Sequence, residues 1–483
     1  MTGLAPRHRP KARPTVWRAW DGNLEAALAA ALAAAAPVVM LTGQRPASGW
    51  LFRPAPAGWA HGEHFTDLDR PVGRFEHHTG ARVELRLAAE WWPGHDLNPT
   101  HAAAAWSLLE REFVRAFRGQ AGLWSTPGTT GVEAWVAATG PDRPGQLEPD
   151  LADLIRQTSP QHRVELVDHD DPPDELPGFA YLDARWSYAA LTRELGSAPA
   201  RMLTAEQAGE LAAREPHARA RYHVRGRVPD GWDHVGVLVC KRDSGDGWHA
   251  PRRPGEPFDT WVDAYELALA GRLGWTVDHV EAIALTQRRP LDTWTERLVR
   301  ARQRILDTDP GPVGSAAAAA VRQIMLTALG GFHSTGRDTL TPITEEQAAR
   351  RLPPDAALER HGSVLVLRRR RVLAGRAALL THPEWSAAVW AKAHARLLEA
   401  PTGTGQWAGV LQLPLADVIG MRGDALYLTR DPGWPDPPDP AGRPVNGRYR
   451  LKGALTGPLP YPRTLADLNK LRAASEAAGT DTR

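Results

Sequence analysis

The sequence has few of the residues that tie a chain to a disulfide-rich, metal-binding or strongly charged class of protein. Cys240 is the one cysteine among 483 residues, which excludes an internal disulfide and a cysteine-built zinc site and fits a reducing cytoplasm. The 58 Lys and Arg nearly balance the 56 Asp and Glu, so the net charge is +2. This balance favours no class of partner, and it does not exclude local basic patches.

Long hydrophobic runs are also missing. The basic start, MTGLAPRHRPKARP, leads into polar residues and not into the apolar core of a signal peptide. The Ala-rich run at residues 24–36 is too short and too weakly apolar to cross a membrane. With 42% hydrophobic and 24% charged residues, the composition is that of a soluble globular protein, and the length predicts about two to four subdomains. We expect a cytoplasmic protein with no membrane partner.

Two apolar runs on either side of a tight turn mark residues 411–429. Residues 418–421 lead into an Arg422-Gly423 turn and residues 425–428 lead out of it, which predicts a β-hairpin with Asp424 at its tip. Turns favour Asp for local reasons, because its short side chain bonds nearby backbone N–H groups. A catalytic role for Asp424 requires a second carboxylate at the same place.

A second acid follows another apolar run. Residues 178–182 predict a buried strand that ends at Asp183, and residues 184–195 then carry a helical pattern that includes Tyr188. An acid at this position is compatible with two roles. It caps the following helix, or it presents a catalytic carboxylate at the edge of a sheet.

The rest of the chain mixes strands and helices, with an α/β domain up to about residue 150 and an acidic, Pro-rich linker at residues 168–175. Further strands are predicted at residues 38–41, 50–52, 81–87, 275–285 and 448–453, with an antiparallel pair over 222–240. Helices are predicted at residues 100–117, 258–272, 291–306, 315–329, 381–398 and 464–474. The helix at 315–329 carries Arg322 and is expected to stop at Gly330, and the helix at 381–398 carries Lys392.

Three other features each allow two interpretations. His61, His64 and the acids at residues 67 and 69 lie in loop-like sequence without further ligands at metal-site spacing, so solvated side chains are favoured over a metal site. Four consecutive arginines, 368–371, are either a solvated, edge-protecting run or a phosphate contact. The 19 tryptophans either pack inward or stack on bases.

The order of these elements resembles that of the family B DNA polymerases, and most closely their protein-primed branch in phages and linear plasmids. The family motif D-x-x-S-L-Y-P falls on residues 183–189, K-x-x-x-N-S-x-Y-G on residues 322–330 and Y-x-D-T-D-S on residues 421–425. The later lysine motif falls on Lys452. The resemblance spans about residues 176–455, and its specificity comes from the order of the motifs rather than from any one of them.

The resemblance implies a mixed α+β fold shaped as a right hand, with an antiparallel-sheet palm, helical fingers and a small thumb. An α/β exonuclease-like domain would occupy residues 1–170, and the first part of the palm with the fingers 171–335. The second part of the palm would occupy residues 336–440, and the thumb with the C-terminal tail 441–483. The predicted first strand of the exonuclease-like domain, VVMLTGQ, has no D-x-E pair, so we expect no proofreading.

The resemblance also gives each motif residue a role. Asp183 and Asp424 would hold two divalent ions, Mg²⁺ or Mn²⁺, for two-metal phosphoryl transfer, and Tyr188 would stack under the deoxyribose. Arg322 and Gly330 would meet the incoming deoxynucleotide. Four cations would track the backbone of the primer–template DNA, namely Lys392, Arg448, Arg450 and Lys452. A terminal protein or another replication protein is a further possible partner.

Several residues depart from the family pattern. Arg422 stands in place of the first acid of the D-T-D motif, Trp186 in place of the motif serine, and Leu326 and Leu329 in place of the fingers Asn and Tyr. The leading prediction is a template-directed DNA polymerase without proofreading. The alternative is a catalytically inactive, DNA-binding protein of the same fold that serves the replication or maintenance of a mobile element. A structural or interaction protein is the third possibility.

Overall fold

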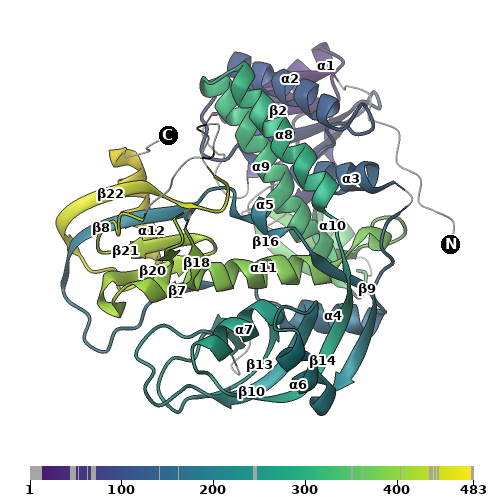
Figure 1. The fold of residues 1–483 in the computed structure, drawn as a ribbon. Helices are drawn as coiled ribbons and strands as arrows, with labels where there is room; N and C mark the ends of the chain where they lie inside the picture. Colours follow the sequence, from purple (N-terminus) through teal and green to yellow (C-terminus); the bar gives the residue numbers. More distant parts are fainter. Residues whose placement is uncertain are drawn as a thin grey trace. The chain divides into compact units, whose positions relative to one another are not determined.

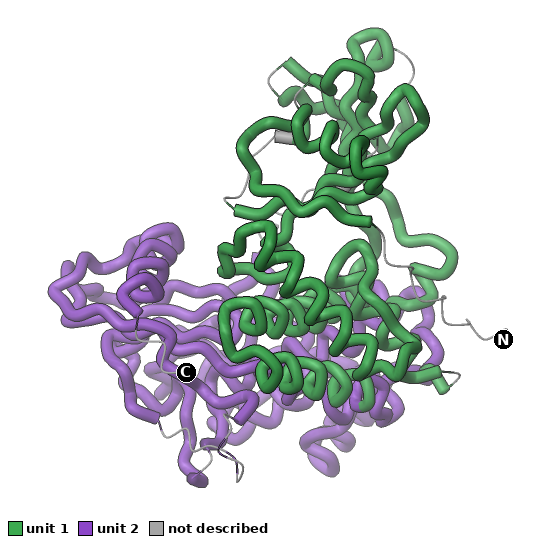
Figure 2. Tube along the Cα trace, turned by 90° about the horizontal axis from the view of Figure 1, so that it is seen from above, with its two compact units in different colours: residues 1–143, 293–381 green, residues 144–292, 382–483 purple. Residues whose placement is uncertain are grey.

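The computed structural model describes residues 14–479, apart from 44–49, 53, 63, 67–71, 141, 162, 243–246, 350–351, 362, 403, 435–438, 440–441 and 443–444. The chain forms two compact units, each built from two separate segments (Figure 2). Unit 1 comprises residues 1–143 and 293–381, and unit 2 comprises residues 144–292 and 382–483. These limits differ from the four predicted segments, whose boundaries stay predictions.

A five-stranded sheet forms the N-terminal part of unit 1, in the order β1-β2-β6-β5-β3, and Figure 1 labels its strand β2. Its strands are β1 (Thr15–Ala19), β2 (Val38–Thr42), β6 (Arg82–Leu87), β5 (Gly73–His77) and β3 (Trp59–His61). The first three run parallel, with α1 (Leu24–Ala33) connecting β1 to β2, and the last two are antiparallel. The predicted strand at residues 50–52 is wrong, because Trp50–Phe52 is one turn of 3₁₀ helix. Three apolar residues fit a buried turn as well as a strand.

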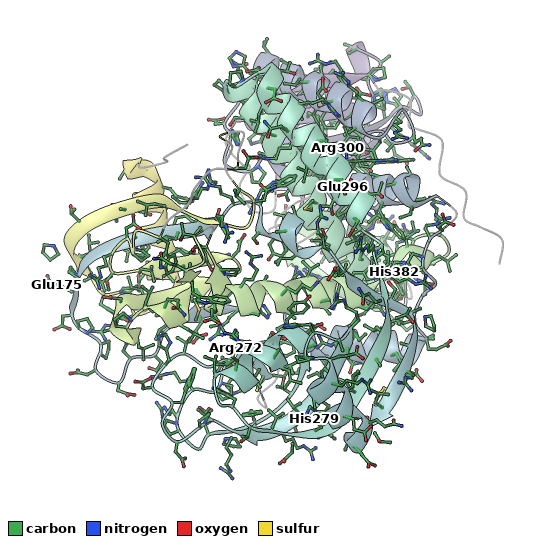
Figure 3. All side chains as sticks on the ribbon, in the orientation of Figure 1. Glu175, Arg272, His279, Glu296, Arg300 and His382 are labelled. Atoms are coloured by element: carbon green, nitrogen blue, oxygen red, sulfur yellow. The ribbon has the colours of Figure 1, made fainter. Side chains whose placement is uncertain are left out.

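Helices make up a second part of unit 1. They are α2 (Pro99–Ala116), α3 (Pro127–Thr139), α8 (Asp292–Thr308) and α9 (Pro312–His333). Helix α9 packs against α2 and α3, and a Cβ at Gly131 of α3 would lie 2.5 Å from the Ala328 methyl of α9, so glycine permits this close approach. On α8, Glu296 and Arg300 form an ion pair one turn apart at 3.4 Å (Figure 3).

The predicted stop of α9 at Gly330 is wrong, since the helix continues to His333. Glycine in a helix costs only about 1 kcal/mol, and the burial of α9 outweighs that cost. Among the described residues, α9 is the one helix long and apolar enough to cross a membrane, with a mean hydropathy of 1.3 in its most apolar window. However, 61% of that window is buried inside the structure, and a core helix of a folded domain has the same length and composition.

A four-stranded antiparallel sheet completes unit 1, in the order β16-β17-β15-β4. Its elements are β16 (Ala356–His361), β17 (Val364–Val372), β15 (Gly336–Ile343) and β4 (His64–Thr66), with α10 (Glu345–Ala348) after β15. The four arginines lie in β17, and acids bind three of them: Arg368 contacts Glu359, Arg369 contacts Asp355, and Arg370 contacts Asp338. The expected loop around His61 and His64 is wrong, because both residues belong to strands.

Unit 2 contains a four-stranded antiparallel sheet in the order β13-β10-β14-β9. The elements of this region are β13 (Pro257–Asp263), β10 (Ala220–Arg227), β14 (Val277–Arg288), β9 (Leu195–Thr204), α6 (Ala205–Arg214), α7 (Ala264–Arg272) and α4 (Pro149–Thr158). The predicted pair over 222–240 is wrong, because β10 pairs with β13 and β14. Cys240 lies instead in the short pair β11 (Cys240–Lys241) and β12 (Trp248–His249). The predicted helix at 258–272 is half wrong, since α7 starts only at Ala264, where the N-cap Asp263 forms a capping box with Glu266 inside the helix.

A second sheet of unit 2 has the order β22-β8-β21-β20-β7 and is antiparallel throughout. Its strands are β22 (Tyr449–Pro460), β8 (Glu175–Ala184), β21 (Ala425–Leu428), β20 (Val418–Arg422) and β7 (Val164–Leu166). One face shares a hydrophobic cluster with α11 (Pro383–Leu398), and the other shares a cluster with α12 (Leu465–Ala478). The predicted fraying after residue 474 is wrong, because α12 continues to Ala478 with Ser475 buried. The short pair β18 (Ala400–Pro401) and β19 (Trp407–Ala408) follows α11.

Candidate active site at the palm-like hairpin

The predicted hairpin is confirmed as β20 and β21. Arg422 pairs with Ala425, so Gly423 and Asp424 form a two-residue turn. Gly423 has a φ of +66°, a conformation that glycine adopts without the steric cost borne by other residues. A positive φ at the first central residue alone fits a type II′ turn, whose twist matches that of the flanking strands. The turn therefore fixes Asp424 at the tip of the hairpin.

Strand pairing brings the second predicted acid next to this tip. Asp183 lies directly opposite Ala425 on the neighbouring strand β8. The Ala184 N–H donates to the Asp424 carbonyl oxygen at 3.2 Å. Asp183 and Asp424 are thus at adjacent, diagonal positions of two paired strands, and both side chains are partly exposed. The structure brings together the two acids that sequence spacing alone places 241 residues apart.

The side chain of Asp424 is held from the segment that follows β8. The Ser187 hydroxyl, in the first turn of α5 (Ser187–Leu191), donates to Asp424 Oδ2 at 3.2 Å. The two side chains, together with Tyr449 and Arg396, line a small cavity of about 10 Å³, roughly the space of one water molecule. Sequence reasoning missed Ser187, Arg396 and Tyr449 as members of this site. The one available signal was the position of Ser187 inside the first motif.

The charges of both acids affect the pKa of the buried Tyr449 phenol. Burial, followed by the negative charge of Asp424 and that of Asp183, raises the pKa of Tyr449. The Tyr449 hydroxyl donates to the Arg396 carbonyl oxygen at 3.3 Å, and burial lowers the pKa of the Arg396 guanidinium. Both carboxylates therefore act within electrostatic reach of one side chain.

Asp183 belongs to a strand of the sheet, whereas Asp424 belongs to the turn. Directly opposed residues share a face and successive residues alternate, so Asp183 shares its face with Ala425 and with Arg450, its partner on β22. Asp424 belongs to the turn and reaches Ser187. The Asp183 carboxylate also helps to raise the pKa of Tyr181.

Arg422, the main departure from the family pattern, is bound away from Asp424. Its side chain is exposed, and Arg422 Nη1 donates to Asn469 Oδ1 on α12 at 2.9 Å. Repulsion between a cation and a bound metal ion falls with distance and with exposure to water. Arg422 therefore leaves the Asp424 carboxylate available as a ligand.

The donor set of this hairpin suits a hard divalent ion. Asp183, Asp424 and Ser187 offer only oxygen, and Mg²⁺ is held by one or two protein carboxylates when phosphates and water supply the remaining ligands. Among the described residues there is no group of three or more His, Cys, Asp or Glu that could hold a metal ion. The residues present thus fit an ion shared with a phosphate-bearing substrate, and they do not form an all-protein cage.

Three of the predicted DNA-contacting cations lie at the start of β22. Arg448, Arg450 and Lys452 are half-buried, and the Arg448 carbonyl oxygen accepts from the Arg185 N–H at 2.7 Å. Tyr188 is buried in α5. This helix starts three residues later than predicted, after Trp186 in a left-handed conformation at φ 47°, and ends at Leu191, before β9 starts at Leu195.

Lys392 has a different environment from the one predicted. It is 6% exposed, Nζ donates to the Arg193 carbonyl oxygen at 2.8 Å, and it lies 4.8 Å from the centre of the Tyr265 ring. Burial lowers its pKa to about 8. Its contact with DNA stays a prediction that this packing does not favour. Arg322 and Gly330 lie on α9 in unit 1, so their predicted contact with the nucleotide at the hairpin also stays a prediction.

The mixed α+β fold is polymerase-like. Its similarity is to solved structures of Phi29 DNA polymerase, whose orthorhombic crystal form matches with a TM-score of 0.57 and 12% identity over 89% of this chain and 78% of that chain. The complex with primer-template DNA matches with 0.56 and 12% over 90% and 78%. The ternary complex with DNA and incoming nucleotide substrates matches with 0.54 and 11% over 89% and 79%. At this identity the likeness establishes a distant fold relationship. No protein-family model and no curated protein matches the chain.

Proposed function

We propose that the protein binds primer–template DNA and adds deoxynucleotides to the primer 3′ end. The observation that carries this proposal is the pairing of β21 with β8, which sets Asp424 beside Asp183. Phosphoryl transfer of this kind needs carboxylates from separate elements that converge on the reacting phosphate. The fold relationship to a polymerase solved with DNA and nucleotides supports the choice of substrate.

The predicted site residues would have separate roles in this reaction. Asp183 and Asp424 would hold Mg²⁺ or Mn²⁺, which supplies charge neutralisation at the transferring phosphate when bound. Ser187 would keep the Asp424 carboxylate oriented through its hydroxyl. Arg448, Arg450 and Lys452 would contact the phosphates of the DNA through their positive charge. Tyr188 would exclude a 2′-hydroxyl from the sugar site, and Arg322 would meet the triphosphate.

A second candidate is a catalytically inactive DNA-binding protein of the same fold. Arg450 lies directly opposite Asp183, and a cross-strand acid–arginine pair is a stabilising arrangement in a sheet without any catalysis. The replacement of the first motif acid by Arg422 also favours the catalytically inactive candidate. This candidate predicts salt-dependent binding to primer–template DNA with no incorporation.

Primer extension by the full chain separates the two candidates. With Mg²⁺ or Mn²⁺ and deoxynucleotides, the wild-type chain should extend a labelled primer, and Asp424→Asn should lower the rate about 100-fold or more, as expected when a group that stabilises transition-state charge is removed. Asp431→Asn is the matched control, because the contact of Asp431 within the described part of the chain is a local N–H donated by Gly433. Extension that is unchanged in Asp424→Asn removes the catalytic assignment. DNA binding without any extension favours the second candidate.

A further inference from the structure

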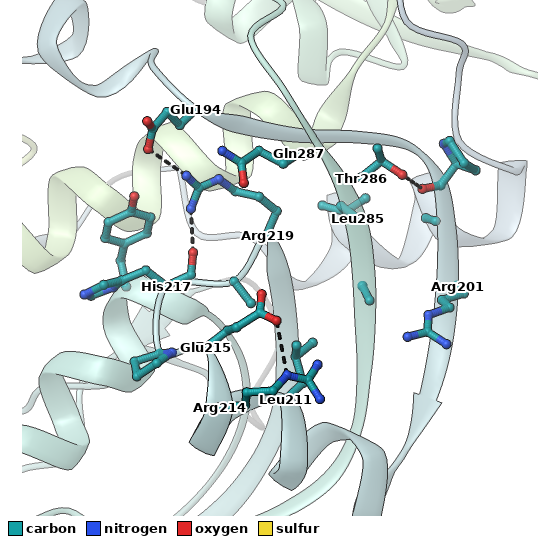
Figure 4. Close-up of a pocket in the computed structure, with 16 residues that line it drawn as sticks. Glu194, Arg201, Leu211, Arg214, Glu215, His217, Arg219, Leu285, Thr286 and Gln287 are labelled. Atoms are coloured by element: carbon teal, nitrogen blue, oxygen red, sulfur yellow. Dashed lines mark hydrogen bonds and ion pairs between the residues drawn. The ribbon is translucent and has the colours of Figure 1, made fainter.

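A separate hollow lies against the four-stranded sheet of unit 2 (Figure 4). Its volume is about 850 Å³, and it is bounded by β9, β14, the end of α6 and the segment 215–219. This volume is within the range of about 300–1,000 Å³ that small-molecule sites occupy. None of the residues assigned to the hairpin site lines it, so it needs an explanation of its own.

Two arginines point toward each other across this hollow (Figure 4). Arg201 projects from β9 opposite Ala284 of β14, whose short side chain leaves the space beside it open. Arg214 projects from the last residue of α6. In the part of the chain that the structure describes, Arg201 makes no hydrogen bond or ion pair, and Arg214 pairs only with its exposed neighbour Glu215 at 3.2 Å.

Two other polar side chains of the wall, those of Arg219 and Thr286, are already engaged. Arg219 donates to Glu194 at 2.8 Å and to the His217 carbonyl oxygen, and Thr286 Oγ1 donates to the Pro199 carbonyl oxygen at 3.0 Å. These bonds fix the shape of the wall. The hollow has three arginines and only two glutamates in its lining, so one guanidinium charge has no acid to balance it.

Among the described residues Arg201 has no acid partner and Arg214 has only the exposed Glu215, so an anion bound between the two guanidinium groups would be attracted by both charges. A basic residue at the end of a helix is favoured by the helix dipole, which accounts for Arg214 and not for Arg201 on a strand. Guanidinium groups bind phosphate oxygens in pairs of parallel hydrogen bonds. We propose that this hollow binds a phosphate group between Arg201 and Arg214, carried either by a small nucleotide or by a nucleic-acid strand.

Calorimetric titration of the full chain tests this site with three probes. These are inorganic phosphate, deoxyadenosine monophosphate and an oligonucleotide without a terminal phosphate. Arg201→Gln should weaken binding about tenfold, which corresponds to about 1.4 kcal/mol, because it removes charge-assisted hydrogen bonds to the phosphate, and Arg214→Gln should do the same. Arg253→Gln is the control, because Arg253 is an exposed arginine of unit 2 outside the hollow, 3.6 Å from Asp168.

The titrations distinguish a small nucleotide, a nucleic-acid strand and the absence of a phosphate site. Tighter, Arg201-dependent binding of the mononucleotide than of phosphate supports the site and identifies a small nucleotide as the source. Arg201-dependent binding of the oligonucleotide alone supports the site and identifies a strand. The proposal is overturned if no probe binds, or if Arg253→Gln weakens binding as much as Arg201→Gln. Circular dichroism of each variant shows whether loss of binding is loss of fold.

Discussion

Replacement of Ser187 by alanine tests how the Asp424 carboxylate is held. The Ser187 hydroxyl donates to Asp424 Oδ2 at 3.2 Å, which is longer than the usual O–H···O distance of about 2.7–2.8 Å. Hydrogen bonds to charged groups contribute about 1.5–3 kcal/mol when well formed. The length of this one, and the partial exposure of Asp424, which lets water replace the hydroxyl, reduce the expected loss to about 1 kcal/mol.

The functional effect of Ser187→Ala should exceed this stability effect. Groups that orient a metal ligand typically change metal affinity about 10- to 100-fold when removed. We therefore expect the Mg²⁺ concentration for half-maximal primer extension to rise about tenfold, with a smaller change in the rate at saturating Mg²⁺. Unfolding of unit 2 should shift by only about 2–4 °C.

Mg²⁺ titration of single-nucleotide incorporation measures this directly, and Ser187→Thr is the control because it retains the hydroxyl. The reasoning is refuted if Ser187→Ala requires the same Mg²⁺ concentration as the wild type. It is equally refuted if Thr fails to restore the Mg²⁺ dependence while the variant remains folded. A purely structural role for Ser187 would alter the melting temperature and leave the Mg²⁺ dependence unchanged.

Two further predictions concern stability. Burial lowers the pKa of His64 to about 3, so the folded state binds fewer protons than the unfolded state below pH 6.5. The free energy of unfolding of unit 1 should therefore fall by about 3 kcal/mol between pH 6.5 and 4. Denaturant unfolding at the two pH values should show a smaller fall for His64→Gln. A Cβ at Gly453 would lie 2.3 Å from the Ser475 carbonyl oxygen, so Gly453→Ala should cost about 1–3 kcal/mol, and an unchanged denaturation midpoint would contradict this packing.

The sequence predicted the hairpin because its pattern is local. Apolar residues on both sides of a turn with glycine specify two paired strands, and β20 and β21 have the predicted positions. Asp183 was also predicted at the end of a buried strand, which β8 confirms to within one residue. The resemblance to polymerases then predicted that the two acids act at one site. The similarity to Phi29 DNA polymerase confirms the polymerase-like fold that the resemblance implied.

The errors arose where local patterns were ambiguous or packing decided the outcome. Residues 257–263 form a strand that passes directly into α7, and no turn residue separates the two elements in the sequence. Helix α9 continues through Gly330 because burial compensates for the low helix propensity of glycine. Lys392 is buried by neighbours far away in the chain, and its carbonyl partner Arg193 is 199 residues distant. The Ser187–Asp424 bond joins residues 237 positions apart, which spacing within a motif does not reveal.

We propose that Asp183 and Asp424 together hold the divalent ions of the hairpin site. Fe²⁺ in place of Mg²⁺, with primer–template DNA, a deoxynucleotide and ascorbate with peroxide, produces radicals that cut the peptide chain near the bound ion. Mass spectrometry of the fragments should locate cuts near both residues 183 and 424, and Asp183→Asn or Asp424→Asn should abolish both sets together. Cuts near only one of the two positions, or cuts that survive in both variants, would contradict a shared metal site.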